Sequence, residues 1–355
     1  GVAWDVFGDG DTVFRAGYGL HYGHVRILGN LSEFRNYQRF TVNITNPTYP
    51  DPYGGRSPAD FITSAPANIT VVANDYVQPY SNQVNVGFSH HLFGDVAVHV
   101  DGVYTHTNHD RKIQDINPRD PVTRLRPNPT FGRVDQNQST GQLKYKALYV
   151  KVEKRYSHRT QALASYTYTR SDDNNLLSRY LDPFDTNLDR GPSAGERRHA
   201  LVASGSVLLP GDMTLGLIWS LRSQLPWSAT AGSDLNRDGF NTDLVPGTTR
   251  NSGSRNLNLA AVNAYRAANG LSTVTESQVD SSRVNMVDLR LNKDFALRGT
   301  RKLQVLAQVF NLFNTENLQA QYGGGRTGSA RSANFGRIFT ARPATQGELG
   351  VRFIW

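Results

Sequence analysis

The sequence predicts an all-β fold: an antiparallel transmembrane β-barrel, to which this chain contributes about eleven strands. Three observations lead to this prediction. Segments of alternating apolar and polar residues recur along the chain of 355 residues. These segments come in pairs joined by very short turns, and long polar segments separate the pairs. The chain ends on Phe353, Ile354 and Trp355, an apolar edge strand that suits a barrel in lipid better than a soluble sheet.

The composition excludes a helical membrane protein and favours a barrel. Hydrophobic residues make up 38% of the chain and the mean hydropathy is −0.48, with no run near the ~18 apolar residues of a membrane helix. Aromatic residues reach 10% beside 32 glycines, which is typical of strands that touch lipid only at alternate positions. The absence of cysteine suits an exported protein.

The net charge of +8 is spread along the chain without a dense cluster, which argues against a nucleic-acid partner. Contact with anionic outer-membrane lipid or lipopolysaccharide would account for it. A basic lumen or an ordinary solvated basic surface would do so equally well.

Short turns define the strand pairs in order along the chain. The first pair, residues 2–7 and 12–23, is joined through Gly-Asp-Gly-Asp at 8–11, a strong turn signal. The same pattern predicts four further pairs and a single last strand. Their turns lie at residues 93–95, 157–158, 210–212 and 298–300, and the last strand covers residues 346–355.

Long polar segments connect one pair to the next. They are rich in Asn, Asp, Gly, Pro, Ser and Thr, and cover residues 24–78, 108–143, 171–197, 225–282 and 314–344. Structureless connections of this length are rare in compact soluble domains. Short turns alternating with long connections are typical of outer-membrane barrels, with turns in the periplasm and loops outside the cell. A periplasmic C-terminus puts every tight turn of this chain on the periplasmic side.

Five charged residues lie on strands whose opposite faces are almost entirely aliphatic. They are Arg222, Asp288, Arg290, Asp294 and Arg352. We expect these side chains to face the lumen, because the opposite face must meet lipid. Leu215, Leu217 and Leu289 are expected on that lipid face.

The last strand also carries an assembly signal. Glu348, Gly350, Phe353 and Trp355 follow the spacing polar-x-Gly-x-x-aromatic-x-aromatic, which resembles the signal that directs barrels to the outer-membrane assembly machinery. The barrel-assembly machinery is therefore an expected partner.

Four further segments, residues 4–22, 196–199, 309–314 and 335–338, carry a wider resemblance. With the terminal strand they resemble the C-terminal half of the barrel in TonB-dependent outer-membrane transporters of the Oar-like kind, which bear a carboxypeptidase regulatory domain. The resemblance implies a barrel of about 22 strands with a plugged lumen, and uptake of an unidentified nutrient. It also implies that residues 1–355 are one part of that barrel. The plug, the TonB-contacting segment and the regulatory domain would lie upstream.

One long segment contains a candidate calcium loop. Oxygen-bearing side chains at alternate positions, followed by glycine, form the first half of an EF-type loop. The ligands would be the side chains of Asp234, Asn236, Asp238 and Asp243 and the carbonyl of Phe240. Position twelve is Val245 where a bidentate Glu is expected, so Asp243 would have to substitute. The alternative is a loop of Asx-turns without a metal.

No catalytic residue is proposed, because the sequence contains neither HExxH nor Gly-x-Ser-x-Gly, and we expect no enzyme activity. The alternative to transport is a structural or adhesive barrel whose long loops bind partners without energised uptake. A third possibility is a secreted soluble β-protein that binds glycans.

Overall fold

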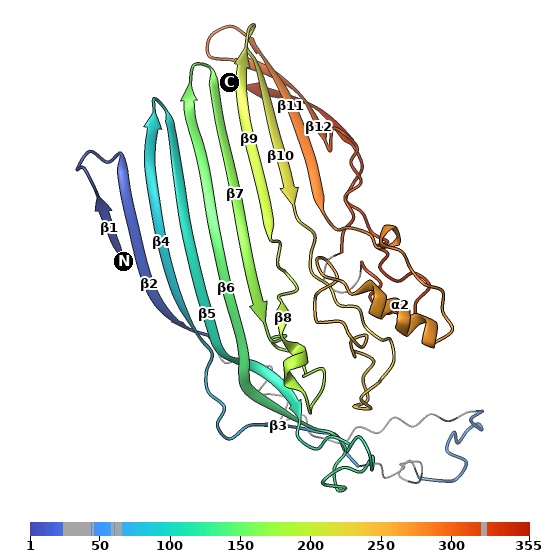
Figure 1. Ribbon diagram of the computed structural model, residues 1–355. Helices are drawn as coiled ribbons and strands as arrows, with labels where there is room; N and C mark the ends of the chain where they lie inside the picture. The colour runs from blue at the N-terminus through green and yellow to red at the C-terminus, as the bar shows by residue number, and fades with distance from the viewer. Residues whose placement is uncertain (24–43, 45, 58–59, 61–65, 321–324) are drawn as a thin grey trace.

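The computed structural model describes residues 1–23, 44, 46–57, 60, 66–320 and 325–355. Parts of the predicted connections 24–78 and 314–344 therefore lie outside the described residues. Within the described part, eleven strands follow one another in a single antiparallel meander, as predicted (Figure 1). They are β1 (Val2–Asp5), β2 (Thr12–Tyr22), β4 (Tyr80–Phe93), β5 (Val96–Asp115), β6 (Val134–Ser157), β7 (Thr160–Asp173), β9 (His199–Leu209), β10 (Met213–Arg222), β11 (Val284–Ala296), β12 (Lys302–Phe310) and β13 (Gln346–Ile354).

Two short strands lie off this path. The first, β3 (Ile69–Val72), pairs in parallel with the start of β6, and β8 (Gly191–Pro192) pairs with the end of β7. In the described residues, β1 and β13 occupy the two edges of the sheet and do not pair with each other.

The connections separate by length. All five tight turns lie at one end of the sheet, and the long connections gather at the other end together with helix α2 (Figure 1). This arrangement confirms the predicted alternation of short turns and long connections.

Within the described residues, the helices all belong to the long connections. They are α2 (Leu259–Ala268) and the 3-10 turns η3 (Thr186–Asp189) and η4 (Glu276–Gln278). Across the described residues, the search for a helix of sufficient length and apolarity to span a membrane finds none.

The hairpin of β5 and β6 is longer than predicted. We expected a loop over residues 108–143, but the strands run to Asp115 and start again at Val134. The 20 and 24 residues of these strands exceed the ~9–11 that cross a membrane, so the hairpin continues beyond it. The register of the two strands is irregular between Thr107 and Lys112. Outside lipid a strand needs no apolar face, so its sequence loses the alternation that predicts strands.

Register confirms the predicted division of the sheet into two faces. Leu217 of β10 lies opposite Leu289 of β11, while its neighbour Ile218 lies opposite Asp288. We call the face that carries Ile218 and Asp288 the polar face, and the face that carries Leu217 and Leu289 the apolar face. The pairings of β10 to β13 place all five predicted charged residues on the polar face.

A buried apolar cluster lies in the long connections instead of the sheet. Ala229, Val245, Val262, Ala330 and Phe335 are buried together, drawn from the β10–β11 and β12–β13 connections. Helix α2 supplies Val262 to this cluster, and Asn258 caps its start by accepting a hydrogen bond from the Ala261 amide at 3.1 Å. We had expected these connections to lack secondary structure. The cluster explains why they do not, because it buries one side of the helix.

Candidate functional site

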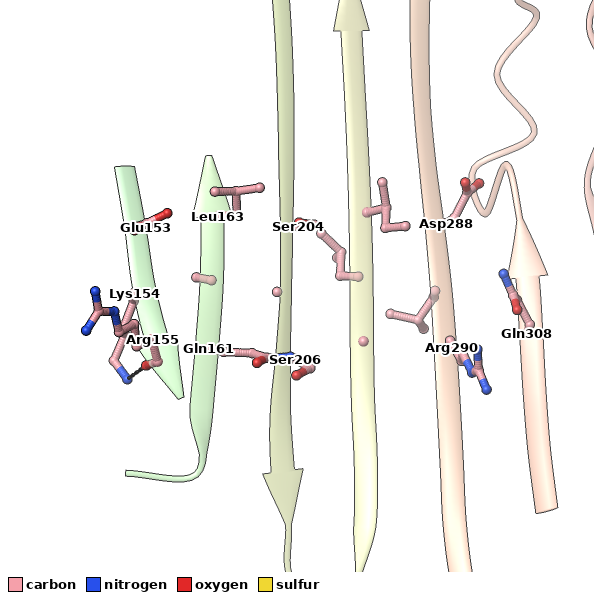
Figure 2. A pocket seen from close by; sticks show the side chains of 16 residues that line it. Glu153, Lys154, Arg155, Gln161, Leu163, Ser204, Ser206, Asp288, Arg290 and Gln308 are labelled. Carbon is pink, nitrogen blue, oxygen red and sulfur yellow. Dashed lines mark hydrogen bonds between the residues drawn. The ribbon is translucent and has the colours of Figure 1, made fainter. Parts of the chain in front are cut away.

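The centre of the polar face is a shallow hollow of about 540 Å³ (Figure 2). Small residues make it: Ser204 and Ser206 on β9 and Gly216 on β10 leave the wall recessed. Asp288 and Arg290 on β11 flank the recess on one side. The polar atoms of this wall can contact a soluble ligand or another polypeptide.

Internal hydrogen bonds hold three of the five predicted charged residues. Arg290 Nε donates to Asn292 at 2.9 Å. Asp288 accepts the Asn311 amide at 2.9 Å, and Asp294 accepts Gln304 Nε2 at 2.8 Å. Among the described residues, the guanidinium groups of the other two, Arg222 and Arg352, make no hydrogen bond or ion pair. They are the free donors of this set.

A second set of polar side chains, which the sequence did not reveal, lies across strands β2, β4, β5 and β6 on the same face. Arg15 lies 3.3 Å from Asp101 and donates to Ser89 Oγ at 2.8 Å. Ser89 Oγ is 2.8 Å from His99 Nδ1. His99 Nε2 lies 3.4 Å from Glu153 Oε1 without a hydrogen bond between them. Only the register of four strands brings these residues together, so no local sequence motif could have predicted this set of polar side chains.

A buried ion pair joins the β5–β6 hairpin to the β7–β8 connection. Lys112 Nζ donates to Asp189 at 2.8 Å, and both side chains are fully buried. The ammonium also lies 4.2 Å from the centre of the Tyr180 ring. Arg250 from the β10–β11 connection pairs with Asp173 beside them. Buried charges are tolerated only when paired and hydrogen-bonded, so these contacts fix three connections relative to one another.

Phe240 docks the candidate calcium loop against its neighbours. The guanidinium groups of Arg133 and Arg179 each lie over its ring, 4.7 Å from the ring centre. Both arginines pair with Asp135 at the start of β6. A cation over the face of an aromatic ring is favourable electrostatically. These contacts pack the β10–β11 connection against the β5–β6 and β7–β8 connections.

Inside the candidate calcium loop, the carboxylates bond to nearby backbone amides. Two of the loop's contacts, from the Asp238 amide to Asn236 and from the Phe240 amide to Asp238, are Asx-turns, the alternative that the sequence left open. The described residues contain no group of three or more His, Cys, Asp or Glu side chains already arranged around a metal position. Calcium binding at Asp234, Asn236, Asp238, Phe240 and Asp243 stays a prediction. The bonds run from the amides of Asp238 and Gly239 to Asp234 (3.1 and 2.9 Å), of Phe240 to Asp238 (2.8 Å) and of Leu235 to Asp243 (2.7 Å).

Electrostatics in this loop favours a bound cation or proton. Burial raises the pKa of Asp238 to about 6, and the charges of Asp243 and Asp234 add to that effect. The pKa of Asp243 is also raised, mainly by burial, with Asp234 and Asp182 contributing. Four carboxylates thus lie close enough to repel one another.

The terminal strand has the faces that the sequence predicted. Glu348 lies opposite Gln308 on the polar face, and Phe353 lies opposite Leu303 on the apolar face. Gly350 leaves room for Leu306, because a Cβ there would lie 3.1 Å from that side chain. The use of this strand as an assembly signal stays a prediction.

A long antiparallel meander with one apolar and one polar face is the wall of a membrane barrel. The outer membrane beta barrel domain family matches residues 1–354. The chain belongs to this family. As an outer membrane beta barrel domain, it resides in the bacterial outer membrane. No curated protein matches it.

Solved structures share the fold of this outer membrane beta barrel domain. The outer membrane transporter YddB from Escherichia coli superposes with a TM-score of 0.55 at 12% identity, over 98% of this chain and 39% of YddB. The ferric-catecholate import receptor Fiu from Escherichia coli K12 gives a TM-score of 0.50 at 11% identity, over 99% of this chain and 34% of Fiu. The chain therefore spans well under half the length of these transporters, and at this identity the likeness shows the fold alone.

Proposed function

We propose that this domain forms part of the barrel of a TonB-dependent outer-membrane transporter that takes up a nutrient. The observation that carries the proposal is the continuous polar face, which runs from Arg15 on β2 to Arg352 on β13. A membrane protein has a reason to keep such a face only if it lines water or another polypeptide. The solved structures with the same fold are named as a transporter and an import receptor, which supports the same class.

The unpaired edges of the sheet support the proposal that further strands complete the barrel. A spanning sheet must close, because lipid cannot satisfy the backbone groups of an open edge. We place this chain in a barrel of about 22 strands, as the Oar-like resemblance implies. Arg222 and Arg352 would then donate to a plug inside the lumen. TonB would be contacted through an N-terminal region of the same protein.

The assembly of long connections would face the outside of the cell and capture the ligand. Its fixed contacts, such as Lys112 with Asp189, suit a preorganised binding surface. The apolar face would meet outer-membrane lipid and lipopolysaccharide, and the barrel-assembly machinery would insert the chain through its last strand.

Depletion of compounds from a defined mixture tests the proposed uptake. Cells with the full-length protein and cells lacking it are incubated with the mixture, each with the inner membrane energised or de-energised. Transport predicts that at least one compound disappears only when both the protein and an energised membrane are present. Binding of compounds or surfaces that is indifferent to energisation would contradict transport and favour the structural or adhesive alternative.

A further inference from the structure

A cavity of about 410 Å³ lies where the long connections meet the sheet. Its lining comes from three separate connections: Arg197 before β9, Trp227 after β10, and Arg326 between β12 and β13. The described residues that line it include no acidic side chain. The cavity is therefore basic, with an aromatic wall.

Arg197 presents unused hydrogen-bond donors at this cavity. Its Nη1 donates to the carbonyls of Ser223 at 2.5 Å and Ser282 at 3.2 Å, which fixes the side chain across the ends of β10 and β11. In the described part of the chain its Nε and Nη2 bond to nothing. The guanidinium group is thus held in place by one nitrogen while the other two remain available for a ligand.

Two further arginines gather beside Arg197. Arg222 is the last residue of β10 and precedes Ser223. The backbone amide of Arg342 donates a hydrogen bond to the Asn317 carbonyl at 2.8 Å. Burial lowers the pKa of Arg197, and the positive charges of Arg222 and Arg342 lower it further. None of the three makes an ion pair within the described residues.

Nearby acids are already engaged elsewhere. The carboxylate of Glu196 is fully buried, pairs with Arg255 and Arg198, and accepts the Ser171 amide at 3.0 Å. The carboxylate of Asp280 pairs with Arg337 at 3.0 Å and accepts the Ile338 amide at 2.7 Å. Positive charges that lie close together without a counter-charge repel one another, so a bound anion would stabilise this arginine cluster.

The other wall of the cavity is also short of acceptors. Arg326 stacks 4.7 Å from the centre of the Trp227 ring and donates to the carbonyls of Gly336 and Asp280. Its Nε and the Trp227 Nε1 are buried and have no hydrogen-bond partner. Buried donors without acceptors are uncommon in folded proteins.

We propose that this cavity binds a ligand bearing an oxyanion, a carboxylate or a phosphate, which accepts charge-assisted hydrogen bonds from Arg197 and Arg326, while the charges of Arg222 and Arg342 attract it from outside the lining. Planar guanidinium groups bind the oxygens of both anions in pairs. Identification of the ligand as transported cargo rests on the proposed function, but the binding itself does not require an energised membrane.

Calorimetry on the purified full-length protein in detergent tests the site, with citrate and inorganic phosphate as probes and glucose as a neutral control. We expect at least one anion to bind and glucose not to bind. Arg197→Gln should weaken the binding about tenfold or more, because it removes a charge-assisted hydrogen bond, and Arg222→Gln and Arg342→Gln should weaken it less, because each removes only a nearby charge. Arg119→Gln, which removes an exposed arginine of the β5–β6 connection, should leave affinity unchanged.

The site would be overturned if neither anion bound at physiological ionic strength. It would also be overturned if Arg119→Gln lowered the affinity for the anion equally, because that would indicate diffuse charge attraction. Arg197→Lys keeps the charge and replaces only the planar group, so it should bind with intermediate affinity and serves if Arg197→Gln fails to fold. Anion binding without energised uptake would contradict the proposed function and leave this site intact. Energised uptake without anion binding would support the proposed function and contradict this site.

Discussion

Asp238 shows how one side chain in the candidate calcium loop depends on its surroundings. Burial raises its pKa to about 6 from the ordinary value of 3.8, and the neighbouring carboxylates of Asp243 and Asp234 add to the shift. The folded loop then binds the proton more tightly than the unfolded loop does. Its contribution to the free energy of unfolding is present at low pH and is lost as the pH rises from 3.8 through about 6.

The first prediction concerns this pH dependence. Hydrogen exchange of the loop, corrected for intrinsic rates, should show protection that decreases from about pH 4 to about pH 7 without calcium. Asp238→Asn should remove most of that decrease, because the amide has no charge to bury. Asp120→Asn, at an exposed carboxylate of the β5–β6 connection, is the control. Protection that rises with pH in the unaltered protein would show that the carboxylate is not disfavoured there.

Calcium should restore the protection at about pH 7 in the unaltered protein and not in Asp238→Asn, because the ion neutralises the clustered carboxylates. The same calcium effect in both proteins would place the ion elsewhere.

At the scale of elements, sequence patterns predicted the strands better than the connections. The tight turns, such as that before Val96, fix the register of each hairpin, and register decides which face each side chain takes. Leu217 and Ile218 could therefore be assigned to opposite faces in advance. The outer part of β5 was missed, because alternation stops where the strand leaves lipid. Helix α2 had a local signal in its Asn258 cap, but its burial depends on distant residues such as Phe335.

The second prediction concerns the docking of the β10–β11 connection. Phe240→Ala removes the ring that Arg133 and Arg179 contact and should cost about 1–2 kcal/mol of local stability. Hydrogen exchange should increase in this connection and near Asp135, while the sheet stays protected. Phe313→Ala is the control, since that side chain is 71% exposed. Unchanged exchange near Asp135 would mean that the two guanidinium groups do not hold the ring.

Contacts between connections were beyond sequence reasoning for a physical reason. The fully buried pair of Lys112 and Asp189 forms only after two connections have packed together. The local sequence around neither residue predicts a buried partner. The same holds for the basic cavity, whose lining residues come from three connections. Local periodicity reports the environment of one segment and contains no information on which segments meet.

At the scale of the whole molecule, we propose that the two ends of the sheet lie on opposite sides of the membrane. The third prediction uses the absence of cysteine from residues 1–355, so that each introduced thiol is unique within this domain. A membrane-impermeant maleimide on intact cells should label Val122→Cys in the β5–β6 connection, where the side chain is 86% exposed. It should leave Asp95→Cys in a tight turn unlabelled until the outer membrane is permeabilised. The opposite pattern would invert the orientation.

If one face of the sheet meets lipid and the other lines the lumen, the same substitution at two neighbouring residues of β10 should have opposite effects on assembly. Leu217 is on the apolar face and Ile218 on the polar face opposite Asp288. Leu217→Arg should cost about 2–4 kcal/mol near the midplane and abolish the heat-modifiable band of the folded barrel on gels. Ile218→Arg, beside a carboxylate in the lumen, should keep that band. Equal assembly of the two variants, or loss with Ile218→Arg alone, would contradict the assignment of the faces.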